Sequence, residues 1–180
     1  NQHNEIVGLV GISHDITERK KTEEQLKKSE AFNRGVLNSL SSHIAVINST
    51  GQIVAVNEAW KQFGINNGAT SSQRNAIGSN YYKVCERAGK AGIEAALEIA
   101  QGMQDVMNEK IATFYFEYPC HSPNEQRWFG MRVMKFESDE PMIVVSHQNI
   151  SARKLAEENL LKSESRLLEA QAIAHIGNWE

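Results

Sequence analysis

The sequence predicts an α+β protein in which five antiparallel strands form one sheet, helices cover one face of that sheet, and a further helix flanks it at each end. Three observations lead to this expectation. Two long stretches of strong helix formers, 17–40 and 151–174, bracket the central part of the chain. Between them, five short runs have the alternation or the β-branched and aromatic content of strands. Segments with helical spacing of apolar residues separate the second run from the third, so the helices are inserted into a single sheet.

Composition excludes several classes of protein. Of the 180 residues, 41% are hydrophobic and 23% are charged, which excludes collagen-like, disordered and disulfide-rich chains. The net charge of −3 gives no electrostatic reason to bind nucleic acid or an acidic membrane. The longest apolar run, Ile6–Ile12, is far shorter than the roughly 20 residues of a membrane span. Cys85 and Cys120 lack metal-ligand spacing, and no basic-then-apolar leader precedes them, so we expect a reducing, cytoplasmic setting.

The chain contains a repeat. Residues 16–30 and 150–164 are identical at nine of fifteen positions and lie 134 residues apart. Similar composition alone could make two Glu/Lys-rich helices alike, but each copy also follows an apolar, strand-like run. The repeat therefore predicts one complete module with parts of its neighbours: the last strand of a preceding domain in 1–16, a linker helix in 17–40, a complete domain in 41–150, an exit helix in 151–173, and the start of a following domain in 174–180.

The first half of the complete domain begins as a hairpin. His43–Ile47 and Ile53–Val56 have the pattern of strands, and the connection between them is short and rich in turn residues. Asn57 suits the N-cap of a short helix over Glu58–Phe63, because its side-chain oxygen can accept hydrogen bonds from the first exposed backbone N–H groups.

The second half contains two helices and three strands. A loop rich in Asn, Ser and Gly leads to two segments with helical spacing, and alternating segments separated by turn residues follow them. The expected helices are Asn80–Ala88 and Ala91–Met107, and the expected strands are Ile111–Tyr118, Arg127–Phe136 and Met142–Ile150.

The two flanking helices carry partial heptad patterns. In the first, Leu26 and Leu40 share a seam with the polar residues Ser29 and Asn33, so that seam is weak. In the second, leucines recur at seven-residue spacing as Leu160, Leu161, Leu167 and Leu168. This spacing favours a parallel homodimer. A solvated helix packed on its own domain is the other interpretation.

Several motifs resemble the PAS domain family of bacterial signalling proteins, and the resemblance covers essentially the whole chain. The Asp-Ile-Thr-Glu-Arg-Lys run of Asp15–Lys20 matches the family's domain ending. Val56–Ala59, Ile77-Gly78 and Arg127–Phe129 match motifs that are weaker individually but occur in the family's order. One departure is that the complete domain ends in Asn-Ile-Ser at 149–151, where the family usually has Asp-Ile-Thr. It therefore lacks the carboxylate that can pair with a basic residue of the exit helix. The resemblance implies a signal relay around the two endings, through Asp15, Thr17, Arg19, Asn149, Ser151 and Arg153.

No catalytic motif accompanies this resemblance. The sequence has no nucleophile elbow, zinc-protease motif, P-loop or dinucleotide fingerprint, and none of the motifs of kinase or nucleotidyl cyclase output domains. We therefore expect a non-catalytic sensory module whose parent protein carries a histidine kinase or cyclic-di-GMP output domain.

The resemblance also allows cofactors to be weighed. Flavin-adduct relatives need a cysteine three residues after the glycine, but Cys85 lies seven residues after Gly78, which favours a small buried hydrophobe. Haem-binding relatives place a histidine on the long helix, and 91–110 contains none. Both cofactors are therefore disfavoured. Flavin held without a covalent bond stays open, and the sequence does not identify a ligand.

A ligand is expected between the sheet and the helices Asn80–Ala88 and Ala91–Met107. His147 is the polar member of the inward-facing row, and either a neighbouring hydroxyl or backbone group satisfies it or a ligand does. Tyr118 and Trp128 either line the mouth of a pocket or cover the sheet, and we expect them to cover the sheet. We expect His121 to be solvated. The candidate pocket residues are Phe114, Phe116, Met131, Val133, Val145 and His147.

Two functions fit these features. The first is a sensor that binds a small molecule and signals through the exit helix. The second is a ligand-free module for dimerisation and relay. Both involve a homodimer and the neighbouring PAS and output domains of the same chain.

Overall fold

The structure is a computed structural model that describes residues 15–68, 76–122 and 125–174. The chain divides into two units, Asn1–Val36 and Leu37–Glu180, which are described separately. The expected last strand of a preceding domain, in 1–16, lies almost wholly outside the described residues. The expected start of a following domain, in 174–180, does so as well. Both stay predictions.

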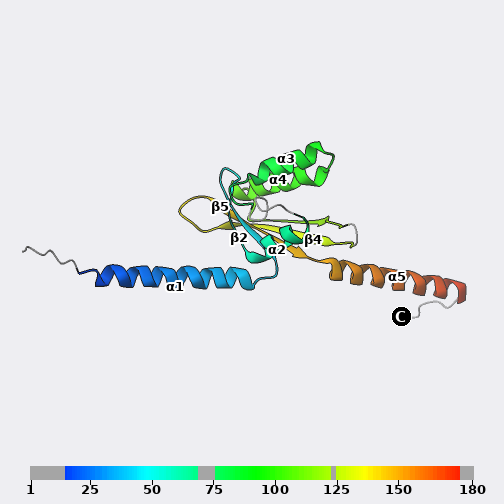
Figure 1. Cartoon of the computed structure of the whole chain (residues 1–180). Helices are drawn as coiled ribbons and strands as arrows, with labels where there is room; N and C mark the ends of the chain where they lie inside the picture. Colours follow the sequence, from blue (N-terminus) through cyan, green and yellow to red (C-terminus); the bar gives the residue numbers. More distant parts are fainter. Residues whose placement is uncertain (1–14, 69–75, 123–124, 175–180) are drawn as a thin grey trace, which may run out of the picture. The chain divides into compact units, whose positions relative to one another are not determined.

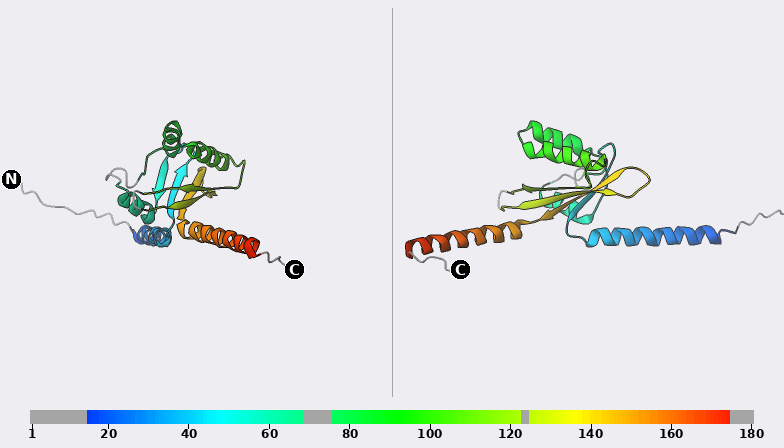
Figure 2. Two further views of the ribbon diagram at one scale, coloured as in Figure 1. Left: turned by 90° about the vertical axis from the view of Figure 1, so that its right-hand side faces the viewer. Right: turned by 180° about the vertical axis from the view of Figure 1, so that it is seen from behind.

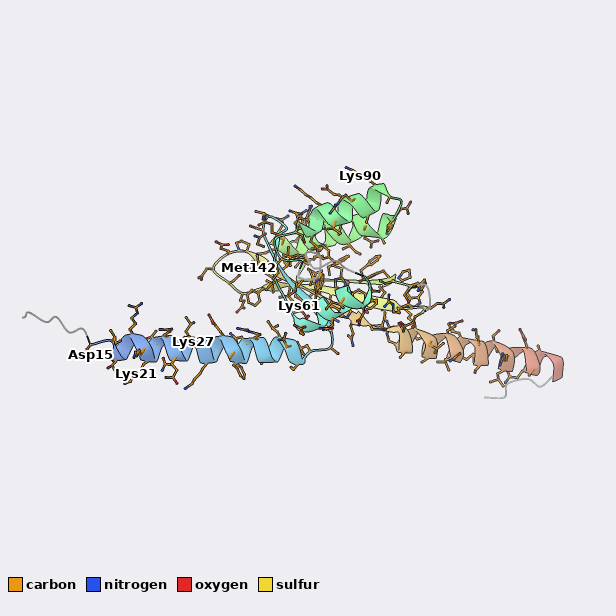
Figure 3. The ribbon with its side chains drawn as sticks, viewed as in Figure 1. Asp15, Lys21, Lys27, Lys61, Lys90 and Met142 are labelled. Carbon is orange, nitrogen blue, oxygen red and sulfur yellow. The ribbon has the colours of Figure 1, made fainter. Side chains whose placement is uncertain are left out.

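The first unit holds most of α1 (Thr17–Ser39), a helix without a buried residue. Asp15 Oδ1 accepts the Thr17 N–H at 2.9 Å and so begins the helix. Ion pairs between Glu23 and Lys27 and between Glu24 and Lys28 follow one face at the four-residue spacing. Lys21 and Lys27 both lie on this helix, and Lys27 is one of the two paired lysines (Figure 3). This helix is therefore supported by local interactions, each worth about 0.3–0.5 kcal/mol.

The second unit contains one antiparallel sheet, as the sequence predicts. Its strand order is β2-β1-β5-β4-β3, so the last strand lies between the first and the fourth (Figure 1). The chain enters the sheet as a hairpin, leaves it for three helices, and returns for three consecutive strands. The strands are β1 (His43–Asn48), β2 (Ile53–Val56), β3 (Thr113–Pro119), β4 (Trp128–Phe136) and β5 (Met142–Asn149).

The helices between β2 and β3 cover one face of the sheet, which confirms the predicted fold class (Figure 2). α2 (Glu58–Asn66) contacts β1, α4 (Glu94–Met107) packs on β3, β4 and β5, and α3 (Tyr81–Lys90) packs on α4. Asn57 and Asn80 cap α2 and α3 with their side-chain oxygens. α5 (Ser151–Ala174) begins where β5 ends.

The three inserted helices that the structure describes, α2, α3 and α4, all have bounds that differ from the sequence expectation. α2 continues three residues beyond Phe63, to Asn66. α3 runs from Tyr81 to Lys90 instead of from Asn80 to Ala88. α4 begins at Glu94, because Gly92 just before it adopts a positive φ of 92°, which interrupts a continuous helix from Ala91.

The hydrophobic core lies between the sheet and α4. Alternation along the strands turns one row of each strand toward the helix, and α4 contributes two fully buried side chains. Gly102 lets α4 approach closely, since a Cβ there would lie 2.4 Å from the ring of Phe114. The buried core residues are Ala45, Ile47, Ile53, Met103, Val106, Met131, Val133, Ile143 and Val145.

Within the described parts of the chain, no helix combines the length and the apolarity that crossing a membrane requires.

Candidate functional site

A cavity of about 280 Å³ lies between the sheet, α2 and the start of α3. Seven of its nine lining residues carry rings, and none of the nine is Lys, Arg, Asp or Glu. The lining, called the ring-lined cavity below, consists of His43, Trp60, Phe63, Gly64, Ala76, Tyr81, Tyr118, Phe129 and His147.

Strand register brings the sheet side of this cavity together. His43 of β1 lies opposite His147 of β5, and Tyr118 of β3 lies opposite Phe129 of β4. From the helical side, the ring of Phe63 meets that of Phe129 edge-on with centroids 5.3 Å apart. Aromatic pairs of this geometry contribute about 0.5–1.5 kcal/mol beyond the area that they bury.

His147 is the polar centre of the cavity. The hydroxyl of Tyr81 lies 3.1 Å from its Nε2, and the hydroxyl of Tyr118 lies 2.8 Å from its Nδ1. Because a neutral imidazole has one donor and one acceptor nitrogen, one tyrosine donates a hydrogen bond and the other accepts one. Of the two interpretations that the sequence left open, the structure shows hydrogen bonding to neighbouring hydroxyls. Contact with a ligand stays a prediction.

Burial keeps Tyr81, His147 and Tyr118, called the triad below, neutral at pH 7. It lowers the pKa of His147 to about 4, and the nearby His43 acts in the same direction. Burial also raises the pKa of both Tyr81 and Tyr118 above the usual value. For His43, burial first and the charge of Arg127 second lower the pKa.

The structure places the six predicted pocket residues differently from one another. Only His147 lines the cavity. Met131, Val133 and Val145 belong to the core, Phe114 packs against that core, and Phe116 stacks on Phe114 with centroids 6.2 Å apart. The cavity lies against α2 and α3 and not against α4, because the close approach at Gly102 lets the Phe114 ring fill the space beneath α4.

Sequence reasoning missed part of this lining. Tyr118, which we expected to pack on the sheet, lines the cavity, whereas Trp128 does not. The aromatic pair Trp60 and Phe63, three residues apart on α2, was the available signal. His121 is exposed, and its Nδ1 accepts the backbone N–H of Arg127 at 3.1 Å.

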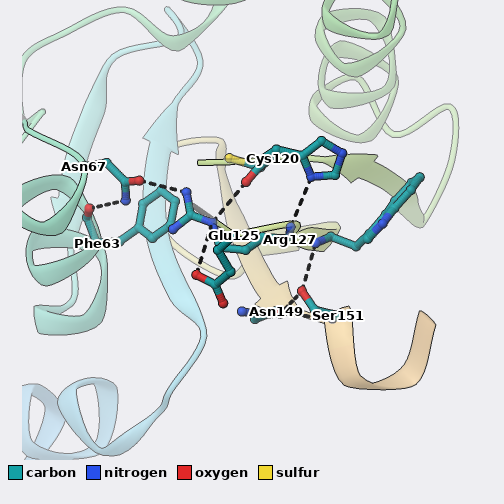
Figure 4. Close-up of polar contacts among 9 residues, drawn as sticks. Phe63, Asn67, Cys120, Glu125, Arg127, Asn149 and Ser151 are labelled. Atoms are coloured by element: carbon teal, nitrogen blue, oxygen red, sulfur yellow. Dashed lines mark hydrogen bonds and ion pairs between the residues drawn. The ribbon is translucent and has the colours of Figure 1, made fainter. Parts of the chain in front are cut away.

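Arg127 is not part of the lining but lies beside Phe63, which is (Figure 4). Its guanidinium carbon is 5.4 Å from the centroid of the Phe63 ring. Its Nη2 donates to Asn67 Oδ1 at 2.8 Å, and its Nε donates to the Cys120 carbonyl at 3.1 Å. These contacts hold the charge outside the cavity lining.

The start of α5 is tied to the sheet. Asn149 Oδ1 accepts the N–H of Ser151 at 3.0 Å and its hydroxyl at 2.6 Å. Ser151 Oγ in turn accepts the N–H of Trp128 at 2.9 Å (Figure 4). Asp15 caps Thr17 in the same way at the start of α1. The amide oxygen of Asn149 therefore replaces the carboxylate oxygen as a helix cap.

The basic residues in the first turn of α5 also pair with a carboxylate. That carboxylate lies on β3 and not at the end of β5, where the resemblance implied it. Arg153 Nη2 lies 2.5 Å and Lys154 Nζ 2.7 Å from the oxygens of Glu117 in β3. The hydrogen bond from Lys154, followed by those from Tyr115 and Arg153, lowers the pKa of Glu117 to about 2. Among the other predicted relay residues, Arg19 is exposed on α1.

Further along α5, the four leucines of the heptad pattern are 60–66% exposed.

Cys85 is buried, and burial raises the pKa of its thiol to about 11, so it is protonated at neutral pH. In the described ranges, no group of three His, Cys, Asp or Glu side chains could hold a metal ion.

No family model matches the chain. The chain is 33% identical over 120 residues to a protein of Rhodobacter capsulatus described as an uncharacterized 104.1 kDa protein in the hypE 3′ region, a match that covers 66% of this chain. The chain spans only 12% of the length of that relative.

Many solved structures are similar to this one, and two PAS domains of named proteins are among them. The PAS domain of Bordetella pertussis BvgS has 14% sequence identity and a TM-score of 0.48, with 78% of this chain and 98% of that domain covered. The PAS domain of an HTR-like protein from Haloarcula marismortui has 13% identity and a TM-score of 0.47, with 73% and 100% covered. With antiparallel strands in the order β2-β1-β5-β4-β3 and α2 to α4 inserted between β2 and β3, the second unit of the chain has the PAS fold.

Proposed function

We propose that the chain is a sensory and signal-relay module of a multidomain bacterial signal-transduction protein, either a sensor histidine kinase or a cyclic-di-GMP enzyme. A small molecule in the ring-lined cavity changes how firmly the sheet holds α5. The module itself has no catalytic role. One observation carries the proposal: the two strands that contribute Tyr118 and His147 to the cavity also contribute Glu117 and Asn149 to the hold on α5.

The path from cavity to helix is short. Tyr118 and Glu117 are neighbours on β3, so their side chains point to opposite faces of the sheet. A ligand that displaces the Tyr118 hydroxyl from His147 shifts β3, and the carboxylate of Glu117 moves with the strand. The change in hold requires only that the ligand bind one arrangement of β3 more tightly than the other.

Replacing Glu117 with Gln should loosen the start of α5. Arg153 and Lys154 lose their shared carboxylate, so we expect several-fold faster amide hydrogen exchange in the first two turns of α5, while exchange in β4 and β5 is unchanged. In the native protein the Glu117 carboxylate stabilises the start of α5 fully above pH 4.5, which is near the ordinary pKa of a glutamate. This stabilisation is lost as the pH falls through about 2, the pKa of Glu117 in the folded protein.

The matched control for this measurement is Glu98→Gln, at an exposed position on α4. Exchange in α5 that is equally slow in both variants would show that Glu117 does not hold the helix, and the proposed relay would lose its mechanical basis.

The exposed leucines favour the second function, a ligand-free module for dimerisation and relay. Leu160, Leu161, Leu167 and Leu168 leave apolar surface in water, and pairing with a second copy would stabilise each by about 1.5–3 kcal/mol if fully buried. Glu164 falls between the two leucine rows at about 100° per residue. The seam is therefore marginal, and a modest input can shift its packing.

Replacing both Leu161 and Leu168 with Asp should convert the chain from a parallel dimer to a monomer. Two buried charges would replace two buried leucines, so the dissociation constant should rise by roughly a hundredfold or more. Sedimentation equilibrium on the full chain measures it. Asn159→Asp with Ser165→Asp, which adds the same charge outside the leucine rows, serves as the control. A native chain that is monomeric at all accessible concentrations would exclude this mode of pairing.

A further inference from the structure

We propose that the ligand of the ring-lined cavity is a small uncharged compound of one or two rings that exchanges hydrogen bonds with the Tyr81–His147–Tyr118 triad. This inference rests on the proposed function and names the chemistry of its signal. Size, charge and hydrogen-bonding capacity support it separately.

The size of the cavity limits the ligand. About 280 Å³ is roughly twice the 150 Å³ or so that accommodates a benzene molecule in a protein core. It lies just below the range of about 300–1,000 Å³ typical of pockets for drug-sized ligands. A single ring with a substituent, or two fused rings, therefore fits. The flat side chains of Trp60, Phe63 and Phe129 offer faces and edges for stacking on such a ring.

The lining gives a charged ligand no partner. Among the described residues that form it, none carries a formal charge, and the two imidazoles are neutral because burial lowers the pKa of His43 and of His147. A carboxylate or ammonium group entering the cavity would lose its hydration without gaining a counter-ion.

The triad supplies the polar contacts. The tyrosine that accepts from the N–H of His147 keeps its own hydroxyl hydrogen for another acceptor, and the tyrosine that donates to His147 keeps its oxygen lone pairs for another donor. In the described part of the chain, neither hydroxyl has a further hydrogen-bond partner. The cavity can thus donate one hydrogen bond to a ligand and accept one. A phenol hydroxyl can make both bonds, whereas an indole N–H can make only the one that a tyrosine oxygen accepts.

The positive charge of Arg127 is a feature near the cavity that argues for an anionic ligand. However, the guanidinium sits against the Phe63 ring and bonds to Asn67 and the Cys120 carbonyl. It also lies 4.0 Å from a carboxylate oxygen of Glu125, so its charge already has partners outside the lining.

The experiment is calorimetric titration of the full chain with phenol and indole and with their anionic counterparts, benzoate and indole-3-carboxylate. We expect each neutral compound to bind at least about tenfold more tightly than its counterpart. Gly64→Met, which enlarges a lining residue of the cavity, should abolish binding. The control Gly35→Met on α1, where a Cβ would meet no described atom within 4 Å, should leave binding unchanged.

A second variant guards against a folding defect in Gly64→Met. Tyr81→Phe combined with Tyr118→Phe should weaken phenol binding several-fold and leave toluene binding unchanged, because only the hydrogen bonds are removed. Benzoate binding as tight as that of phenol, especially if Arg127→Gln abolishes it, would overturn the ligand class, and so would failure of all four probes to bind. If the neutral rings bind but leave hydrogen exchange in α5 unaltered, the ligand class stands and the proposed sensory function fails.

Discussion

Replacing Asn57 with Asp should lower the free energy of unfolding of the second unit by about 3–5 kcal/mol, the range found when a buried charge is left without a partner. Asn57 is 1% exposed and uses both ends of its amide. Its Oδ1 accepts the N–H groups of Ile44 at 2.9 Å and Trp60 at 3.0 Å. Its Nδ2 donates to the carbonyls of Leu37 at 3.1 Å and Ser42 at 2.8 Å.

An aspartate can keep the two accepted hydrogen bonds but cannot make the donated ones. Its second oxygen would face the two carbonyl oxygens, so the carboxylate must either stay charged against them or take up a proton at a cost in stability. We therefore expect the urea midpoint of the circular dichroism signal to fall sharply, with an unchanged slope.

Asn80→Asp is the matched control, because Asn80 caps α3 as Asn57 caps α2 but is only partly buried. Aspartate is a good N-cap residue, and the one donated bond that it would lose, from Asn80 Nδ2 to the Thr50 carbonyl, is exposed, so the change should cost less than about 1 kcal/mol. Similar small losses in both variants would show that the contacts of Asn57 beyond its capping bond add little.

Asn57 shows which contacts can be predicted from the sequence and which cannot. The position of Asn57 before a helical segment was enough to predict its bond to Trp60, which is a local contact. Its bonds to Leu37 and Ser42, 20 and 15 residues away, depend on where the end of α1 meets the sheet. Local patterns do not contain that information. The strands and their single antiparallel sheet were accessible for the opposite reason, since alternation is a local property and the helices are inserted at one point of the chain. The lateral order β2-β1-β5-β4-β3 came only from the structure.

The same distinction applies to the site. Alternation correctly turned Val145 and His147 toward the helices, because period two is a local property. Which inward residues border a cavity depends on what faces them. Phe114 meets Gly102 and fills the space under α4, whereas His147 faces two tyrosine hydroxyls beside an opening. The pairing of Arg153 with Glu117, 36 residues away, likewise required the fold.

The second large effect is a loss of stability in mild acid that His147→Gln should remove. In the unfolded chain the histidine titrates near 6.5, and in the folded protein its pKa is about 4. Between these values the unfolded state binds more protons, so the free energy of unfolding must fall as the pH is lowered from 6.5 to 4 and be constant above that window. A shift of this size corresponds to a loss on the order of 3 kcal/mol.

The groups packed around His147 explain why it resists protonation. Tyr81 from α3 and Tyr118 from β3 occupy its two nitrogens, Trp60 from α2 lies with its ring centroid 5.7 Å away, and His43 from β1 would repel a second positive charge. None of these groups carries a negative charge that could stabilise an imidazolium. A proton on His147 therefore requires one tyrosine to turn away or the cavity to open.

Urea titrations of the native chain and of His147→Gln between pH 7 and 4.5 measure this effect, because most of the window lies above the titration of the carboxylates whose pKa is lowered, including Glu117 and Asp105. Gln keeps one donor and one acceptor for the tyrosines but does not titrate there, so its curve should be much flatter. The exposed His121→Gln should follow the native curve. If His147→Gln loses stability in parallel with the native chain, the acid sensitivity lies elsewhere, with His43 the next group to replace, since its pKa is also lowered by burial.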